Sequence, residues 1–548
     1  MRLLNLIILF FLCIPFDFLA QNSNILLGKS YFSSFEQDIY FNYNSHSSFK
    51  PLINHSLNYN IDSVLEQKDR LNIYQNKYFR KLFTEDLFVL KGQDYRLTIS
   101  PILNLSYGKE LVDNKRVYTN TRGYIIKGDL GKSISFFSTF SENQSVFSNY
   151  LNDYILKNNI VPGQGYARDF KEEGFDYAMS SGYVSFSPSK SFVMQFGHGK
   201  HFIGDGYRSL LLSDNSFNYP FLRIQTTFGI FQYTNLYAEF QDIRYFEYNN
   251  INNNDQFGYA KKYMSSHYLS INITRKLNIS FFESIIWRAN HAPGENGFDF
   301  QYLNPAALLR PIEFSINSPD NALVGLNFNY KFTSNSFLYF QFVLDEFTLE
   351  KLKNEPDYWA NKYGYQIGYK HYNLGVKNLT SQIEYNYVRP YTYAHHNPAQ
   401  NYAHYNQPLA HPLGANFSEF IFIAKYMLNK WEFNGKLIFI KYGAKKLNDP
   451  TSYGNDLYMS TGNYAEENQL SNIGSGRPSD FGIYMYQGNE TNVIYQSLDL
   501  SYIVNRKMNL KCNLQISFRS SKDEYFNQNT HLVSFGIKTD LFNHYYDF

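Results

Sequence analysis

The sequence predicts an all-β protein, a transmembrane antiparallel β-barrel of the outer-membrane type with about 16–18 strands and a small N-terminal region. Apolar and polar residues alternate from about residue 95 to the end of the chain, as in strands with one face in lipid. Tight turns alternate with long polar loops between these segments. The first residues resemble an export signal, so the chain is predicted to leave the cytoplasm.

The composition is compatible with this fold. Of 548 residues, 50 are Tyr and 50 are Phe, and aromatic residues make up 19% of the chain. The aromatic girdles of a membrane barrel explain this content, although an A/T-rich genome would also raise it without structural meaning. The alternation along the chain favours the barrel. A formal net charge of +2 gives no reason to expect a nucleic-acid partner, and after residue 20 no run of about 18 apolar residues predicts a membrane helix.

Residues 1–20 are predicted to be a secretory signal peptide. Arg2 precedes a mostly apolar run, and the small residue Ala20 marks the expected cleavage site. Cys13 follows a leucine, which is not the small residue that lipoprotein processing requires. Cys512 is then the single cysteine of the mature chain, so no internal disulfide is expected. Its apolar neighbours at alternate positions predict a buried or lipid-facing thiol.

Residues 21–92 are predicted to form a small periplasmic or plug-like region. Their pattern is irregular, and Lys50-Pro51 interrupts a segment rich in Ser and Asn. From Tyr74 to Phe88 the apolar residues follow a loose helical period, which predicts one or two short helices.

Residues 93–548 are predicted to form the barrel. The clearest strand is 323–332, in which apolar residues alternate with polar residues and Gly. Its partner follows after a short turn, with apolar residues at alternate positions of 338–344. Alternate residues of 277–287 are also apolar, with Glu283 as an interruption. A closed barrel pairs every backbone N–H and C=O between strands, which lipid requires.

The connections alternate in length, as they do in outer-membrane barrels. Tight turns are predicted at 274–276, 334–335, 428–430 and 505–507. Long loops are predicted at 143–181, 244–264, 346–361, 391–416 and 443–490. A soluble β-sandwich would have loops of more even length, so this alternation favours the barrel.

The chain ends on a pattern of aromatic residues. The last strand is predicted to run from Val533 to Leu541. Phe542, Tyr546 and Phe548 follow at even spacing and resemble the C-terminal signal that the outer-membrane insertion machinery reads. The histidine between the first two of these aromatics departs from that pattern.

A Gly-rich stretch, 196–214, concentrates charge and histidine at the end of a predicted strand. A metal site of His198, His201 and Asp205 would have loose spacing, and no helix follows that would suit a phosphate-binding loop. A hydrolase would need Ser209 beside a His–Asp pair, and nothing in the spacing is specific for one. The simplest interpretation is that these charges neutralise one another at the lumen wall, without a metal or cofactor. The predicted lumenal charge network consists of His198, Lys200, His201, Asp205, Arg208 and Asp214.

Two further stretches stand out. Residues 302–313 contain two prolines that a central strand does not tolerate, so a structured loop or fold-in is predicted. Residues 389–416 combine Tyr, His and amide side chains without an acidic residue. Such a mixture suits a sugar, although a polar loop held by ordinary hydrogen bonds is an equal alternative. The candidate polysaccharide-binding residues are Arg389, Tyr391, Tyr393, His395, His396, Tyr402, His404, Asn406, Gln407 and His411.

Three motifs resemble the Wzi-type capsule-assembly family, and more closely its Bacteroidetes branch, the RemB gliding-motility proteins. They are the Gly-His-Gly-Lys-His-Phe-Ile-Gly-Asp-Gly-Tyr-Arg stretch, the Tyr-Leu-Asn-Pro…Arg-Pro element at 302–311, and the Arg-Pro-Tyr…Gly-Ala-Asn block at 389–416. The resemblance covers about residue 90 to the end and implies a barrel of about 18 strands. It also implies a lectin-like role in anchoring surface polysaccharide, a link to cell movement, and no enzyme. The His-rich block departs from the enterobacterial capsule proteins.

The sequence therefore predicts a protein of the cell outer membrane that binds or anchors surface polysaccharide and supports cell-surface motility. The expected partners are outer-membrane lipid, surface polysaccharide and proteins of a gliding or secretion machinery. Two other functions stay open: a porin-like diffusion channel for small solutes and a hydrolase at the barrel rim. A lumen closed by 302–311 and 391–416 would disfavour the channel.

Overall fold

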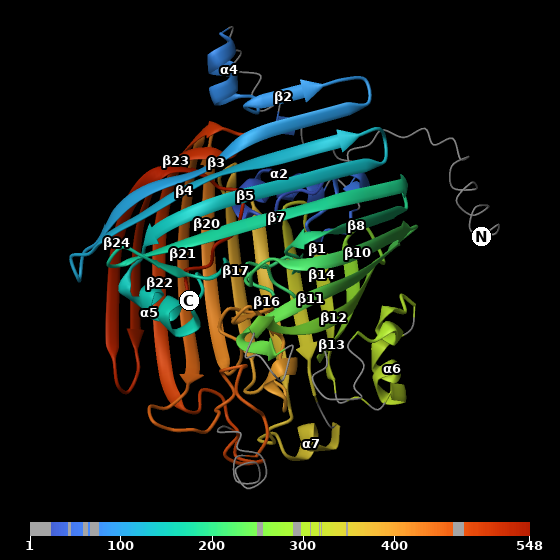
Figure 1. Cartoon of the computed structure of the whole chain (residues 1–548), viewed down its shortest axis with the longest axis vertical. Helices are drawn as coiled ribbons and strands as arrows, with labels where there is room; N and C mark the ends of the chain where they lie inside the picture. Colours follow the sequence, from blue (N-terminus) through green and yellow to red (C-terminus); the bar gives the residue numbers. More distant parts are fainter. Residues whose placement is uncertain are drawn as a thin grey trace, which may run out of the picture.

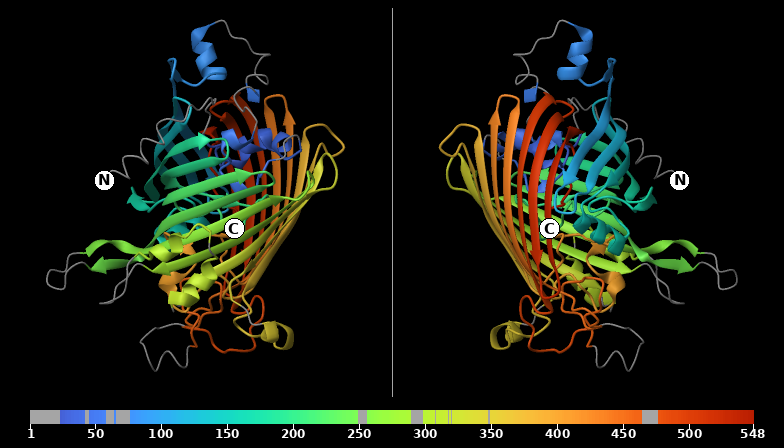
Figure 2. Two further views of the ribbon diagram at one scale, coloured as in Figure 1. Left: turned by 90° about the vertical axis from the view of Figure 1, so that its right-hand side faces the viewer. Right: turned by 90° about the vertical axis from the view of Figure 1, so that its left-hand side faces the viewer.

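The protein folds into a closed antiparallel β-barrel with segments of its own chain packed inside (Figures 1 and 2). The predicted signal peptide, 1–20, lies outside the residues that the structure describes. The computed structural model describes residues 23–41, 45–57, 64–65, 76–248, 256–288, 298–306, 308–316, 318, 320–346, 349–463 and 476–548.

The described chain forms an 18-strand barrel, which β24 closes by pairing with β3. The all-β barrel predicted from the sequence is therefore confirmed. Two short strands extend the sheet, β2 (Phe88–Lys91) on β3 and β6 (Arg168–Phe170) on β7. The barrel strands are β3 (Tyr95–Glu110), β4 (Arg116–Leu130), β5 (Ile134–Val146), β7 (Gly174–Ser189), β8 (Phe192–Gly199), β10 (Tyr219–Phe228), β11 (Phe231–Tyr248), β12 (Gln256–Asn272), β13 (Leu277–Arg288), β14 (Asn321–Lys331), β15 (Ser336–Leu344), β16 (Tyr363–Tyr372), β17 (Leu379–Val388), β20 (Phe417–Leu428), β21 (Trp431–Ala444), β22 (Asn489–Asn505), β23 (Leu510–Lys522) and β24 (Asn527–Thr539).

Short elements lie in the N-terminal region and in the connections. No helix in the described part of the chain is both long and apolar enough to cross a membrane. These elements are α2 (Lys29–Phe41), β1 (Phe49–Lys50), η1 (Asn54–Leu57), α4 (Lys77–Phe83), α5 (Asn149–Asn158), β9 (Phe202–Ile203), η2 (Phe300–Leu303), α6 (Leu309–Ile316), α7 (Leu349–Asn354), η3 (Pro398–Gln400), β18 (Ala403–His404) and β19 (Gln407–Pro408).

Side chains alternate between the two faces of the wall, as the sequence predicts. On β14, Val324 and Leu326 are exposed on the outside, whereas Asn327 and Asn329 are buried and face the lumen. Asn327 lies opposite Gln341 of β15, which also faces the lumen. This part of β14 is thus apolar outside and polar inside, as strands in lipid require.

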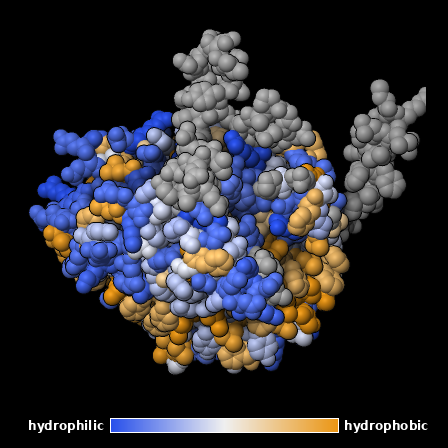
Figure 3. All heavy atoms as spheres, turned by 90° about the horizontal axis from the view of Figure 1, so that it is seen from below, coloured by the Kyte–Doolittle hydropathy of each residue, from blue (hydrophilic) through white to orange (hydrophobic). Residues whose placement is uncertain are grey.

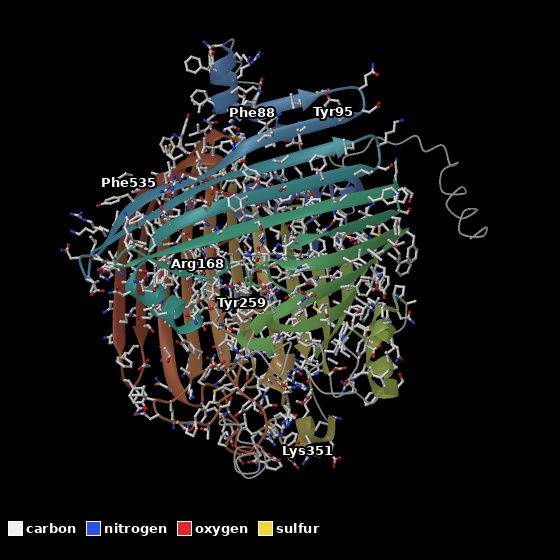
Figure 4. All side chains as sticks on the ribbon, viewed as in Figure 1. Phe88, Tyr95, Arg168, Tyr259, Lys351 and Phe535 are labelled. Atoms are coloured by element: carbon white, nitrogen blue, oxygen red, sulfur yellow. The ribbon has the colours of Figure 1, made fainter. Side chains whose placement is uncertain are left out.

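The two ends of the barrel differ. One end carries short connections such as 229–230 and 429–430, and we call it the turn end. The other carries long connections such as 389–416, and we call it the loop end (Figure 1). Figure 4 labels Phe88 at the turn end and Lys351 at the loop end.

The connection predicted at 244–264 is largely strand. Strand β11 continues to Tyr248 and β12 begins at Gln256, so this hairpin projects from the rest of the wall (Figure 2). Its sequence is polar because it extends beyond the apolar part of the wall, and a polar hairpin has the composition of a loop.

The described N-terminal residues up to Leu57, which we call the plug, lie inside the barrel near the turn end, where α2 sits in the lumen (Figure 2). Lys370 Nζ of β16 lies 2.7 Å from Glu36 Oε1 of α2. On another part of the wall, Arg223 Nη1 of β10 donates to the carbonyl oxygen of Pro51 at 2.8 Å. The segment therefore spans the lumen and is bonded to strands on well-separated sides.

The last residues of the chain also lie inside the barrel and not in its wall. Strand β24 ends at Thr539, and residues 540–548, which we call the tail, turn back into the lumen. Tyr545 and Asp547 of the tail are buried there. The evenly spaced aromatic residues of the tail therefore do not belong to the last strand. Their spacing does not distinguish the two locations, because a packed lumen accepts the same aromatic side chains as lipid.

The expectation that residues 302–311 close the lumen is wrong. The described residues of this range lie on the outer wall, where the Tyr302 ring packs against Trp287 of β13 with 4.7 Å between ring centroids. The Tyr237 hydroxyl of β11 donates to the Leu303 carbonyl oxygen at 3.0 Å. Prolines exclude a central strand, but they do not determine which side of the wall a loop covers.

We predict that the packing of α2 contributes strongly to stability. Phe35 of α2 is fully buried among apolar residues of the plug and the wall. Phe35→Ala should leave a cavity and lower the free energy of unfolding by about 3–5 kcal/mol. Thermal unfolding in detergent micelles, followed by circular dichroism, measures the loss. Phe281→Ala on the outer face of β13 is the matched control and should have a much smaller effect; equal losses would contradict the placement of α2 in the lumen.

Candidate functional site

A buried charge cluster occupies the lumen. Arg208, between β9 and β10, points its guanidinium at Glu419 of β20, with 3.0 Å between Arg208 Nη2 and Glu419 Oε1. The same nitrogen lies 3.1 Å from Asp547 Oδ1 of the tail. His411 Nε2, from the connection before β20, lies 2.6 Å from Glu419 Oε2. We call Arg208, His411, Glu419 and Asp547 the central cluster.

The central cluster joins strands on opposite sides of the barrel. Arg208 belongs to the connection between β8 and β10, and β17 and β20 lie across the lumen in strand order. The backbone N–H groups of Tyr207 and Arg208 donate to the carboxylate of Glu384 on β17 at 2.6 and 3.0 Å. Successive side chains of a strand point to opposite faces. Neighbours such as Ile383 are exposed on the outside, so Glu384 and Glu419 point inward.

Glycine is required where this connection meets the wall. A Cβ at Gly206 would lie 2.5 Å from Glu384 Oε2. At Gly204, which has a φ of +130°, a Cβ would lie 2.4 Å from Gln341 Nε2. Without side chains the backbone can approach both polar groups closely. Gly204 and Gly206 of the 196–214 stretch therefore serve packing at the lumen wall.

Pairing determines the charge of this cluster, because isolated buried charges are costly. Burial alone raises the pKa of Asp547, but attraction to Arg208 and Lys436 outweighs burial and holds that pKa well below its ordinary value. Burial lowers the pKa of His411, and attraction to Glu419 offsets this only in part. Near neutral pH, Asp547 is therefore ionised and His411 is neutral.

Asp205 forms a second buried node, which ties the same connection to the N-terminal plug. Its Oδ1 accepts a hydrogen bond from the Tyr40 hydroxyl of α2 at 2.5 Å. Its Oδ2 accepts from Ser48 Oγ at 2.8 Å and from Asn329 Nδ2 of β14 at 3.0 Å. Burial raises the pKa of Asp205, but Lys50, at 3.7 Å, and these hydrogen bonds outweigh it and lower the pKa.

Asp214 ties the connection to the tail. Its Oδ2 accepts from Asn543 Nδ2 at 2.6 Å, and its Oδ1 accepts from the Tyr545 hydroxyl at 2.8 Å. The Lys29 ammonium of α2 stands 4.6 Å from the Tyr545 ring centroid and 4.5 Å from that of Tyr207. Burial lowers the pKa of Lys29 to about 7. The N-terminal helix, the connection and the tail thus meet at one place.

The charged residues predicted as a lumenal network do lie in the lumen, but their main partners come from elsewhere in the chain. Asp205 and Arg208 do not pair with each other, since each has an oppositely charged partner on another segment. Lys200 Nζ donates to the backbone carbonyl oxygens of Gly163 and Asp214. Spacing in the sequence does not reveal such partners, because they are inward-facing residues of distant strands and of the tail.

The two histidines of the stretch lie apart from these carboxylates. A His201 ring nitrogen lies 3.2 Å from the Tyr219 hydroxyl, and His198 Nδ1 lies 3.2 Å from the Ser180 carbonyl oxygen. Ser209 Oγ donates to a backbone carbonyl oxygen. Among the described residues, no group of three His, Cys, Asp or Glu side chains could hold a metal ion.

The candidate polysaccharide-binding residues are mostly buried, and their side chains bond to other connections. The hydroxyls of Tyr393 and Tyr402 donate to the carbonyl oxygens of Leu210 and Leu211 at 2.6 and 2.7 Å. His396, by contrast, is exposed. The buried candidates are Arg389, Tyr391, Tyr393, His395, Tyr402, His404, Asn406, Gln407 and His411.

Amide side chains extend this closure to a further connection. Gln407 Oε1 accepts from the Gly163 N–H at 2.6 Å, and Asn406 Nδ2 donates to the Asn158 carbonyl oxygen at 2.9 Å. The 389–416 connection therefore closes the loop end by hydrogen bonds to its neighbours. Sugar binding by these residues stays a prediction, and the structure gives them a structural role.

His404 illustrates how specific this closure is. Its Nδ1 accepts from the Gln241 backbone N–H at 3.0 Å, and its Nε2 lies 3.1 Å from the Asn218 carbonyl oxygen. A neutral ring with its proton on Nε2 satisfies both contacts. Burial lowers the pKa of His404 to about 3.

Two cavities, of about 320 and 290 Å³, lie beside the cluster. They share lining residues on β21–β24 and in the tail, among them Lys436, Asp499, Lys538 and Asp540. Positive and negative side chains balance there, so neither cavity presents a surface of one charge.

A group of aromatic side chains at the loop end was not found from the sequence. The ring centroids of Tyr358 and Phe481 lie 5.4 Å apart, and those of Tyr358 and Trp359 lie 6.1 Å apart. The Asp357 carbonyl oxygen accepts from the Ile483 N–H at 3.0 Å and holds the two segments together. We call Tyr358, Trp359, Phe481 and the neighbouring Tyr484 the aromatic platform.

The aromatic platform is open to solvent. Phe481 and Tyr484 are 45% and 64% exposed. Arg477 stacks 4.0 Å from the Trp359 ring centroid, and Lys351 stands 5.2 Å from that of Phe481. Seen from below in Figure 3, most of the middle of this end is hydrophilic and hydrophobic residues gather along part of the rim. The sequence signal was weak, because the contributing segments are far apart and not periodic.

A comparison with solved structures supports the fold through the similarity to Wzi. No family model matches the chain, and no curated protein matches it. Among solved structures, the chain is similar to Wzi, an outer membrane protein involved in group 1 capsule assembly in Escherichia coli, with a TM-score of 0.52 and 12% identity. That match covers 95% of this chain and 99% of Wzi. OprD from Pseudomonas aeruginosa matches with a TM-score of 0.41 and 12% identity over 83% of this chain and 98% of OprD.

We predict that the Asp205 node holds the plug in place. Asp205→Ala should leave Tyr40, Asn329 and Lys50 without their buried partner and lower the free energy of unfolding by about 3–5 kcal/mol. The melting temperature in detergent measures this. Asp169→Ala, at an exposed site on β6, is the control and should change stability by about 0.5 kcal/mol or less. An unchanged melting temperature for Asp205→Ala would contradict this role.

We predict that acid destabilises the closure through His404. Its pKa is lower in the folded protein than the ordinary 6.5, so the unfolded chain binds more protons between these values. His404 therefore supports stability above about pH 6.5, and this support declines by up to about 1.4 kcal/mol per pH unit as the pH falls.

The measurement is the melting temperature of the protein from about pH 8 to about pH 4. His404→Asn should be less stable than the parent at the upper limit and should lose less stability on acidification. Parallel curves for the two proteins would show that His404 does not carry the effect.

Proposed function

We propose that this outer-membrane β-barrel binds surface carbohydrate at its loop end and works by holding a ligand at the cell surface, not by passing solutes or by catalysis. The observation that supports this most is the filled lumen. The connection 200–218, the plug and the tail meet there through buried charges. A barrel with so much chain inside is suited to presenting its loops.

The fold similarity supports the same proposal. Wzi, which matches over nearly its whole length, is described as a carbohydrate binding β-barrel. The aromatic side chains of the 389–416 connection are largely buried, so they are not the first contact that a ligand from outside would meet. Short turns face the periplasm in outer-membrane barrels, so the loop end is the extracellular end.

The aromatic platform is the best candidate for the contact with sugar. Aromatic faces stack on the C–H face of a pyranose, and nearby polar groups bond its hydroxyls. Phe481 and Tyr484 offer exposed rings, and Asp480 and Lys351 carry charge beside them. His396 lies at the same end and adds an exposed imidazole.

Capsule attachment and gliding are the cellular roles that we propose for this binding. The three sequence motifs and the fold both resemble those of capsule-assembly proteins. The resemblance of the motifs to the RemB gliding-motility branch is the reason for proposing a role in cell movement. In this role the barrel would contact outer-membrane lipid, surface polysaccharide and proteins of a gliding or secretion machinery.

We expect purified protein in detergent to bind surface polysaccharide or fragments of it on a glycan array. Phe481→Ala combined with Tyr484→Ala should weaken binding about tenfold, because each stacking contact contributes about 0.5–1.5 kcal/mol. Phe526→Ala, an exposed site between β23 and β24, is the matched control and should bind normally. Equal binding by all three proteins would exclude the platform, and no binding to any glycan would contradict the proposed function.

In cells, a strain that lacks the protein should retain less stained polysaccharide on its surface and should spread less on agar. Complementation with the chain that carries Phe481→Ala and Tyr484→Ala should restore protein level but not staining. Full restoration of both staining and spreading by this variant would contradict the link between sugar binding and either role.

A further inference from the structure

The outer wall changes character along β13 towards the loop end. Phe281 faces outward and is exposed, as a lipid-facing residue should be. Ile285 and Trp287 share its parity and also face outward, yet both are buried, with Trp287 4% exposed. Something other than lipid covers this part of the wall. The cover is made by residues 298–316, from the connection between β13 and β14.

Several contacts fix this cover on the outside of the barrel. Trp287, Tyr302 and Leu309 belong to one buried apolar cluster with Ile285, and Ile312 packs against that cluster. The contact of Tyr237 with the backbone of η2, described above, places η2 on β11 as well. In Figure 1, α6 accordingly lies beside β13 and outside the barrel. We call residues 298–316, as far as the structure describes them, the outer flap.

The outer flap shields a polar pair that faces away from the lumen. His267 Nδ1 of β12 lies 2.8 Å from Glu283 Oε1 of β13. The Leu309 N–H, at the start of α6, donates to Glu283 Oε2 at 3.1 Å. A charged group on the lipid face of a barrel wall is destabilising. The flap therefore satisfies a carboxylate that would otherwise face the membrane.

The opposite side of the flap is strongly apolar and open. Phe300, Leu308 and Phe314 are 77%, 67% and 72% exposed. Arg310 lies over the Phe314 ring at 4.9 Å, and its Nη1 pairs with Glu313 Oε2 at 2.5 Å. Aromatic rings beside an arginine are typical of the boundary between lipid tails and headgroups.

We propose that the outer flap is a membrane anchor that places Phe300, Leu308 and Phe314 in the outer leaflet of the surrounding bilayer. The occupant is lipid and not a second protein, because the exposed face continues the lipid-facing belt of β13 and β14. Phe281 and Val324 of that belt are exposed directly beside the part of the wall that the flap covers. The flap thereby fixes the depth at which the loop end stands above the membrane.

The test uses a single cysteine that carries an environment-sensitive nitrobenzoxadiazole fluorophore in liposomes of phosphatidylcholine and phosphatidylglycerol. Cys512 is a free, exposed thiol on β23, and labelling it reports a position on the lipid-facing wall. Leu308→Cys and Phe300→Cys, each with Cys13→Ala and Cys512→Ser, place the label on the flap. Phe526→Cys in the same background is the water-exposed control at the loop end. All four sites are exposed, so the substitutions leave the core packing unchanged.

Spin-labelled lipids with the quencher near the headgroup or deep in the tail then report depth. Labels at 308 and 300 should show blue-shifted emission and lose more fluorescence to the shallow quencher than to the deep one. The label on Cys512 should be quenched by lipid as well, and the label at 526 should not. If the flap labels behave like the label at 526, the proposal of a membrane anchor is wrong. The same result is expected if the flap binds a partner protein in cells and not lipid. Glycan binding does not enter this test, so its outcome is independent of the proposed function.

Discussion

The closed state of this barrel depends on one arrangement of charge, the contact of Arg208 with Glu419 and Asp547. A guanidinium in the buried lumen is tolerated only where carboxylates meet it, so the wall, the connection and the tail must converge on one point. Asp205 and Asp214 then tie the plug and the tail to that same connection. Segments from both ends of the described chain therefore form one polar core. Removing any one partner leaves a buried charge in this core without its pair.

This core limits where the proposed carbohydrate ligand can bind. The Tyr, His and amide groups of the 389–416 connection have the chemistry that sugars need, but their hydrogen bonds are already made to neighbouring connections. For the proposed carbohydrate binding this leaves the rim, where the aromatic platform is exposed. The outer flap also has one occupied face and one open face. Its apolar residues on one face pack against the wall, and those on the other face are exposed on the outside of the barrel.

The sequence predicts the wall well because a strand between lipid and a polar lumen must alternate at every second residue, as 323–332 does. It predicts the interior poorly. Many buried residues inside this barrel are polar or aromatic, so their composition resembles that of an exposed binding loop, and His404 and Tyr402 illustrate this. The partners of Arg208 are visible only as inward-facing carboxylates such as Glu384 and Glu419, and strand parity would have identified them. The tail and residues 302–311 depend on tertiary contacts that no local pattern encodes.

The most direct test of this account is the electrical conductance of the purified protein in planar lipid bilayers. Because the polar core crosses the lumen, the account predicts almost no steady current through the intact protein. A chain without residues 540–548 should conduct, since Arg208 and Asp214 lose their contacts with the tail. Stable, porin-sized current steps from the intact protein would contradict the central claim that the barrel is closed by its own chain.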